Sequence, residues 1–106
     1  MSIAKTPKPP YYAVIFTAVS TGDVEGYEEM GEKMVELASE QEGFLGIEWA
    51  GGEAEITVSY WKDAESIRKW YENAEHKLAQ QKGFEKWYQS FTIRVCKVER
   101  DNVFEK

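Results

Sequence analysis

Cysteine and histidine are nearly absent from this chain of 106 residues, which contains one of each. A single cysteine, Cys96, excludes an internal disulfide, and one Cys with one His is too few for a structural zinc site. Cys96 lies in an apolar segment, 93–98, where a small buried residue is expected. A chain without disulfides fits a reducing compartment, so we predict a cytoplasmic protein without a metal site.

Basic residues and long apolar runs are also scarce. The net charge is −6 and the pI is about 4.8, so the chain repels a phosphate backbone and nucleic-acid binding is not expected. No segment approaches the roughly 20 apolar residues of a membrane span. No glycine-rich nucleotide-binding motif is present, and no cofactor is predicted.

Proline occurs three times, always within residues 1–10. This segment lacks the apolar stretch of a signal peptide, and prolines disfavour helix in the residues before them. We expect an extended N-terminal arm over 1–10, a single domain over 11–100 and a charged C-terminal tail over 101–106.

Aromatic residues, by contrast, make up 14% of the chain, which indicates a packed core, an interface or a pocket for a flat ligand.

Residues 11–19 are predicted to form a strand that is apolar on both faces, so both faces should be covered. The helices of one small chain cover one face. Covering the second face requires another sheet, which predicts a homodimer.

The remaining pattern predicts one architecture. A helix is expected over 24–40, ended by Gly43, and strands over 44–50 and 55–61 should pair as a hairpin around Gly51-Gly52. Asp63 is the predicted N-cap of a second helix, which Gly83 interrupts before a short helical turn over 84–88. A last strand is expected over 91–98. The order β-α-β-β-α-β is that of a ferredoxin-like α+β protein with a four-stranded antiparallel sheet.

Aromatic residues gather where the strand 55–61 ends and the second helix follows. A ligand pocket between the sheet and the helices is one interpretation, and core packing is the other. The candidate residues for binding an aromatic substrate are Trp61, Trp70, Tyr71, Phe16 and Met34.

Two side chains are candidate catalytic groups that exchange a proton with the substrate. His76 is the only side chain with an ordinary pKa near neutrality, and Tyr60 offers a hydroxyl. On an ideal helix His76 lies about 180° from Ile67, away from the apolar stripe, so an exposed surface histidine is the alternative.

Several segments of the chain resemble the antibiotic-biosynthesis-monooxygenase-like superfamily, and the likeness extends from about Tyr11 to Arg100. It is closest to a small bacterial subgroup without established activity. The resemblance implies a dimeric α/β barrel, in agreement with the doubly apolar first strand. The segments that carry it are 11–16, 26–27, 34–38, 42–46, 56–61 and Trp70 with Glu75-His76.

The superfamily implies two kinds of activity. Some members are cofactor-independent monooxygenases that oxidise polycyclic aromatic compounds with molecular oxygen, and we expect this activity on an aromatic small molecule. Others degrade heme with an Asn, a Trp and a His. Trp70 matches that Trp, but residues 12–20 contain no Asn and His76 lies too early in the helix. A non-catalytic binding or sensing dimer is the first alternative, and a heme-binding or heme-degrading protein is the second.

Overall fold

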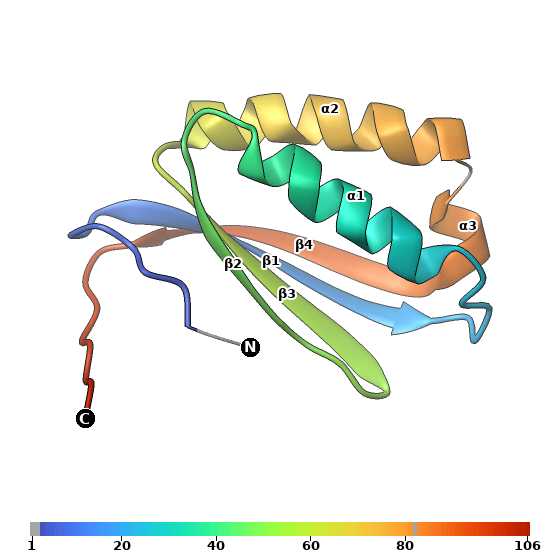
Figure 1. Cartoon of the computed structure of the whole chain (residues 1–106), viewed down its shortest axis with the longest axis horizontal. Helices are drawn as coiled ribbons and strands as arrows, with labels where there is room; N and C mark the ends of the chain where they lie inside the picture. The colour runs from blue at the N-terminus through green and yellow to red at the C-terminus, as the bar shows by residue number, and fades with distance from the viewer. Residues whose placement is uncertain (1–2, 82) are drawn as a thin grey trace.

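The computed structural model describes residues 3–81 and 83–106, with side chains described for 3–74 and 85–106. Four strands form one antiparallel sheet in the order β2-β3-β1-β4, and the helices lie on one of its faces (Figure 1). The predicted ferredoxin-like α+β architecture is confirmed. The elements are β1 (Tyr11–Ser20), α1 (Tyr27–Ser39), β2 (Phe44–Ala50), β3 (Ala54–Trp61), α2 (Ala64–Gln81), α3 (Gly83–Trp87) and β4 (Tyr88–Val98).

Two element boundaries differ from the prediction by three residues. Helix α1 begins at Tyr27 rather than Val24. Gly22 and Gly26 adopt left-handed φ angles of 92° and 76°, and because Gly26 is not helical, the helix can start only after it. Strand β4 begins at Tyr88 rather than Phe91. Its first residue pairs with Ser20 across a register shift at the end of β1, so the last strand is longer than its alternation suggested.

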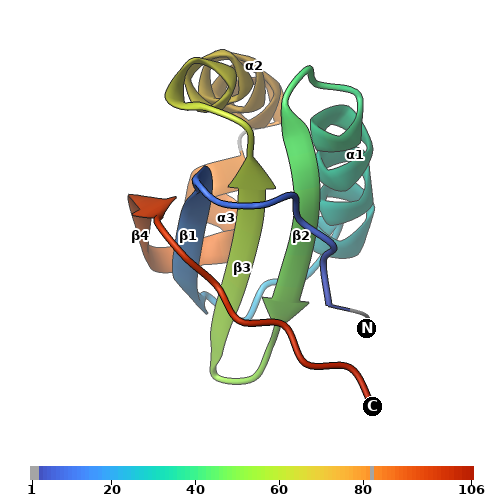
Figure 2. The same cartoon turned by 90° about the vertical axis from the view of Figure 1, so that its left-hand side faces the viewer.

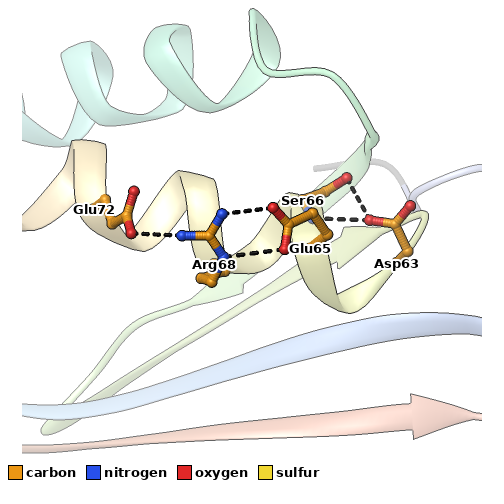
Figure 3. A network of polar contacts seen from close by, with 5 residues as sticks. All are labelled: Asp63, Glu65, Ser66, Arg68 and Glu72. Atoms are coloured by element: carbon orange, nitrogen blue, oxygen red, sulfur yellow. Dashed lines mark hydrogen bonds and ion pairs between the residues drawn. The ribbon is translucent and has the colours of Figure 1, made fainter.

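The corner between β2, β3 and α2 is built around Gly43, whose φ is 90°. A Cβ at Gly43 would lie 2.1 Å from the Ser66 Oγ, and the Gly43 carbonyl accepts a hydrogen bond of 2.7 Å from the Lys62 N–H. Asp63 accepts hydrogen bonds from the N–H and the Oγ of Ser66, at 2.8 and 2.7 Å (Figure 3). The predicted N-cap is confirmed. Figure 3 also shows Arg68 on the surface of α2, where it bridges two glutamates.

The hydrophobic core lies between the sheet and the helices. Its buried centre comes from four elements, with Val14 on β1 and Trp61 on β3 packed against Ala38 on α1 and Ile67 on α2. Trp61 has an exposed fraction of 0%. Half-buried aromatic side chains surround this centre: Tyr12, Phe44, Trp70 and Tyr71.

None of the described helices lies on the opposite face of the sheet, and the described terminal segments, 3–10 and 99–106, run beside it (Figures 1 and 2). The Ala4 N–H donates to a Glu48 carboxylate oxygen at 2.9 Å, and the Tyr11 hydroxyl donates to Asp101 at 2.7 Å. Tyr11 is buried. Ile56 and Val19, toward the other end of this face, remain exposed. The second apolar face of β1 is therefore partly covered within the chain itself.

Among the helices that the structure describes, none is both long enough and apolar enough to cross a membrane.

Candidate functional site

Three of the predicted substrate-binding residues lie together in the core. Trp61 stacks on Trp70 with ring centroids 5.8 Å apart and meets Phe44 edge to face at 5.4 Å. Its indole N–H donates to the Ser59 Oγ at 2.9 Å. Tyr71 packs against the same centre. Because Trp61 has no exposed surface, this part of the predicted site belongs to the packed interior of the chain as folded.

The candidate catalytic residue Tyr60 lies on the face of the sheet without helices, because neighbouring residues of a strand point to opposite sides. Its hydroxyl donates to Glu48 at 2.7 Å, and its ring meets Tyr11 at 5.9 Å. Burial and the hydrogen bond to Glu48 raise the pKa of Tyr60. Tyr60 and Trp61 therefore cannot contribute to one pocket within a single chain.

Two further candidates, Met34 and His76, lie on the helices. Met34 is half-buried on α1. The backbone of His76 belongs to α2, but its side chain lies outside the described residues, so its role stays a prediction.

Phe16 lies in a second group of aromatic residues, which we call the β4 aromatic cluster: Phe16, Tyr27, Trp87, Tyr88 and Phe91. Tyr27 meets the rings of Trp87 and Tyr88 edge to face, at 5.6 and 5.8 Å. Phe16 meets Tyr88 at 5.3 Å and stacks on Phe91 at 5.5 Å. The cluster thus joins β1, α1, α3 and β4 on the helix side of the sheet.

A chain of hydroxyl groups runs from this cluster to a carboxylate. The Tyr88 hydroxyl lies 3.3 Å from that of Tyr27, and the Tyr27 hydroxyl donates to Glu55 Oε2 through a short hydrogen bond. Glu55 pairs with Ala18 in the sheet and so shares its side with the helices. Burial and the hydrogen bond to Glu55 raise the pKa of Tyr27, and burial raises the pKa of Tyr88. Both hydroxyls are therefore protonated at neutral pH.

Trp87 holds the two tyrosines in place. It is buried, with 5% of its surface exposed, and its indole N–H donates to the Glu25 carbonyl at 2.8 Å. The Thr21 N–H donates in turn to the Trp87 carbonyl at 3.0 Å. The loop before Tyr27 is thus fastened to the residue before Tyr88, which explains why residues 61 positions apart in the chain meet.

An apolar strip continues from the cluster along β4. Phe91, Ile93 and Val95 pair with Ala18, Phe16 and Val14, so they lie on the helix side of the sheet. Their exposed fractions are 40%, 37% and 53%. Such a strip offers an apolar floor for a flat ring.

A pocket of about 190 Å³ lies beside Trp87 and is lined by residues from α1, α3 and the loop before α1. Its rim is charged on both sides, and it contains none of the predicted site residues. Its lining residues are Glu25, Gly26, Glu29, Met30, Lys33, Lys86 and Trp87.

Sequence reasoning missed Tyr27, Glu55 and Tyr88. Tyr27 falls in the helix predicted over 24–40 and Tyr88 in the helical turn predicted over 84–88, and neither position distinguishes a site residue from a packing residue. One signal was available. Alternation along β3 puts Glu55 on the same side as Trp61, and a carboxylate on the buried side of a strand is unusual.

The sheet, its strand order and the helices on one face make the chain a ferredoxin-like α+β protein. Residues 10–82 match the antibiotic biosynthesis monooxygenase family, and the chain belongs to that family, as the resemblance predicted. It is 47% identical over 107 residues to the uncharacterized protein YqjZ of Bacillus subtilis (strain 168), covering 98% of this chain and 93% of that protein. The family match ends before α3 and β4.

Solved structures share the fold at low sequence identity. SnoaB, a cofactor-independent oxygenase from Streptomyces nogalater, superposes with a TM-score of 0.73 and 11% identity, over 92% of this chain and all (100%) of SnoaB. A dimeric ferredoxin-like protein from an uncultured marine organism has a TM-score of 0.70 and 10% identity, over 92% of this chain and 95% of that chain.

Proposed function

We propose that this protein is a cofactor-independent monooxygenase that acts on an aromatic small molecule bound at the β4 aromatic cluster. One observation carries the proposal. An exposed apolar strip on β4 lies next to two half-buried tyrosines, Tyr88 and Tyr27, whose hydroxyls are hydrogen-bonded in series to the Glu55 carboxylate. Membership of the family and the fold shared with a cofactor-independent oxygenase support the same reaction class.

The chemistry asks little of the protein beyond placement and one proton transfer. An electron-rich aromatic substrate that loses a proton reacts with molecular oxygen through its own carbanion. Phe16 and Phe91 would align the ring, and the cluster would keep water from the reacting carbon. The hydroxyl chain supplies polar groups at one end of an otherwise apolar surface.

The site residues proposed here replace part of the predicted set. Phe16 is kept, because it contacts both Tyr88 and Phe91. Trp61, Trp70 and Tyr71 are assigned to the core that supports the site, and Tyr60 to the opposite face. His76 remains a candidate proton carrier on sequence grounds alone.

We also propose that the protein acts as a homodimer joined through the helix-free faces of the two sheets. Ile56 and Val19 expose apolar surface there, and the similar marine protein is dimeric. Light scattering of the purified protein measures the mass directly. Ile56→Glu, which puts a charge into that face, should give the mass of one chain.

Oxygen consumption tests the activity. The metal-free protein, with chelator present, is mixed with an anthrone or a dihydroxynaphthalene, and incorporation of labelled oxygen into the product is followed by mass spectrometry. Phe91→Ala should raise KM several-fold. Trp49→Ala removes a somewhat more exposed aromatic residue from the other edge of the sheet and serves as the control.

Other outcomes separate the alternatives. Saturable ring binding without oxygen uptake would favour a binding or sensing dimer. A Soret shift with added hemin would favour the heme alternative. If the protein neither takes up oxygen with these compounds nor binds any of them, the proposed function is overturned.

A further inference from the structure

We propose that Glu55 is the terminal proton acceptor of this site and that it works through Tyr27 and Tyr88 on a phenolic or enolic hydroxyl of the substrate. This inference rests on the proposed function and deepens it by naming the substrate class: neutral, flat ring compounds with an ionisable O–H group.

The direction of the hydrogen bonds supports a relay. A carboxylate can only accept hydrogen bonds, so the Tyr27 hydroxyl donates its proton to the hydrogen bond with Glu55. The oxygen of Tyr27 is then an acceptor for the proton of Tyr88, 3.3 Å away. The Tyr88 oxygen is consequently left as an acceptor, on a ring that contacts those of Phe16 and Phe91. All donors in the chain point the same way, toward Glu55.

The proton count closes along this chain. The substrate O–H bond breaks and its proton joins the Tyr88 oxygen, while the proton of Tyr88 moves to Tyr27 and that of Tyr27 moves to Glu55. The products are a neutral carboxylic acid at Glu55, two neutral tyrosines and a substrate anion. The anion then reacts with molecular oxygen, the oxidant of the proposed reaction.

Burial explains why the carboxylate and not a tyrosine is the acceptor. The raised pKa values of Tyr27 and Tyr88 mean that neither holds a negative charge at neutral pH, so each passes a proton on. The carboxylate also selects the ligand. A negatively charged ligand would be repelled by Glu55 across this half-buried space, whereas a neutral hydroxyl can approach Tyr88.

The substrate floor is adjacent to the end of the relay. Tyr88 meets the Phe91 ring at 5.8 Å, and Phe91 begins the exposed apolar strip that continues through Ile93. A ring lying on that strip places a substituent hydroxyl near Tyr88. Tyr88, Phe91 and Ile93 follow the segment that matches the family, whereas Tyr27 and Glu55 lie within it, so only the substrate end of the relay lies beyond that match.

Ionisation of a bound chromophore tests the relay without oxygen. A nitronaphthol, whose anion absorbs at longer wavelength than its neutral form, is titrated with the protein under anaerobic conditions at a pH where it is neutral in solution. The wild-type protein should produce the anion band. Glu55→Gln and Tyr27→Phe should lower the anion-to-neutral ratio of the bound probe about tenfold or more, with the ring still bound.

The variants separate a relay from a structural role. Tyr88→Phe touches neither Glu55 nor its hydrogen bond, yet it should lose the anion band to the same degree as Tyr27→Phe. Glu48→Gln makes the same change at the Tyr–Glu pair on the other face and should keep the band. If Glu55→Gln fails to fold, the two Tyr→Phe variants, which retain their rings, carry the test.

The outcomes distinguish this inference from the oxygenase proposal. An anion band without oxygen uptake supports the relay and removes the oxygenase. Oxygen uptake with kcat unchanged in Glu55→Gln and Tyr27→Phe supports the oxygenase and overturns the relay. The relay is also overturned if the wild-type protein binds the probe without ionising it. With the relay correct, kcat in both variants should fall about 100-fold or more.

Discussion

Replacing Trp61 should destabilise the fold rather than weaken substrate binding. Its side chain is fully buried, stacks on Trp70 and donates its N–H to Ser59. Trp61→Phe keeps an aromatic ring at the centre of the core but removes the donor and leaves unfilled space. The variant therefore separates the contribution of the hydrogen bond to stability from that of having an apolar ring at this position.

The magnitude follows from these two losses. Leaving the buried Ser59 oxygen without its donor costs about 1–3 kcal/mol, and the space left by the smaller ring costs about 1 kcal/mol more. The sum of about 2–4 kcal/mol is a large part of the roughly 5–15 kcal/mol by which such a domain is stable. It corresponds to a decrease in Tm of about 8–30 °C.

Urea and thermal unfolding of Trp61→Phe, Ser59→Ala and the double variant measure this energy. Because both single variants break the same hydrogen bond, the double variant should lose less than the sum of their effects, by about 0.5–3 kcal/mol. A stability within 0.5 kcal/mol of the wild type, combined with a weaker affinity for an aromatic ligand, would refute the reasoning and return Trp61 to the pocket wall.

Three further predictions concern the frame around the site. Gly43→Ala should lose at least the roughly 1–3 kcal/mol of a strained left-handed residue, and Ser66→Gly in the same chain should restore part of it by removing the clashing atoms, both measured by urea unfolding. The hydrogen bonds from Ser66 lower the pKa of Asp63, so the cap should stabilise the fold above the ordinary pKa of 3.8 and lose its effect as the pH falls through the lower folded value. The Tm difference between wild type and Asp63→Ala should shrink on acidification, and a constant difference would contradict this. Tyr11→Phe should lose about 0.5–1.5 kcal/mol and speed amide exchange around Asp101, and unchanged exchange would mean that this hydrogen bond does not hold the tail.

The overall fold was predictable because local signals agree with one another. Alternating apolar residues gave the strands, three- and four-residue spacing gave the helices, and Asp63 marked a helix start. Gly43 was wrong as a helix end, because α1 ends at Ser39 with Glu40 as its C-cap, and Gly43 lies in the turn that follows. The two misplaced boundaries have different causes. Helix α1 starts late because Gly26, directly before it, is left-handed. Strand β4 starts early because its first residue pairs with Ser20 and the Thr21 N–H donates to the Trp87 carbonyl, and no local pattern reports contacts between residues so far apart in the chain.

The candidate site was less predictable, because periodicity assigns a residue to a face but not to a neighbour. It placed Trp61 and Trp70 correctly on the inner side, yet it could not tell a closed core from an open pocket. Tyr60 was chosen for its hydroxyl, although the alternation that puts Trp61 inside puts Tyr60 outside. Phe16 was the one candidate from the predicted set that the β4 aromatic cluster retains.

The strongest sequence signal for function is one that conflicts with folding. Position 55 lies on the inner side of β3, where a β-branched apolar residue would pack against Ala18 and the first turn of α1 without any desolvation penalty. A glutamate there needs the Tyr27 hydroxyl to satisfy it, and Tyr27 in turn needs a position beside Tyr88. Stability alone favours none of these polar groups over apolar ones of similar shape, because replacing both members of a buried hydrogen bond by apolar groups is close to neutral. The one property that the three residues provide and an apolar trio does not is a path for a proton from the apolar floor of β4 to a carboxylate, which is the reason to look for an ionisable hydroxyl on the substrate.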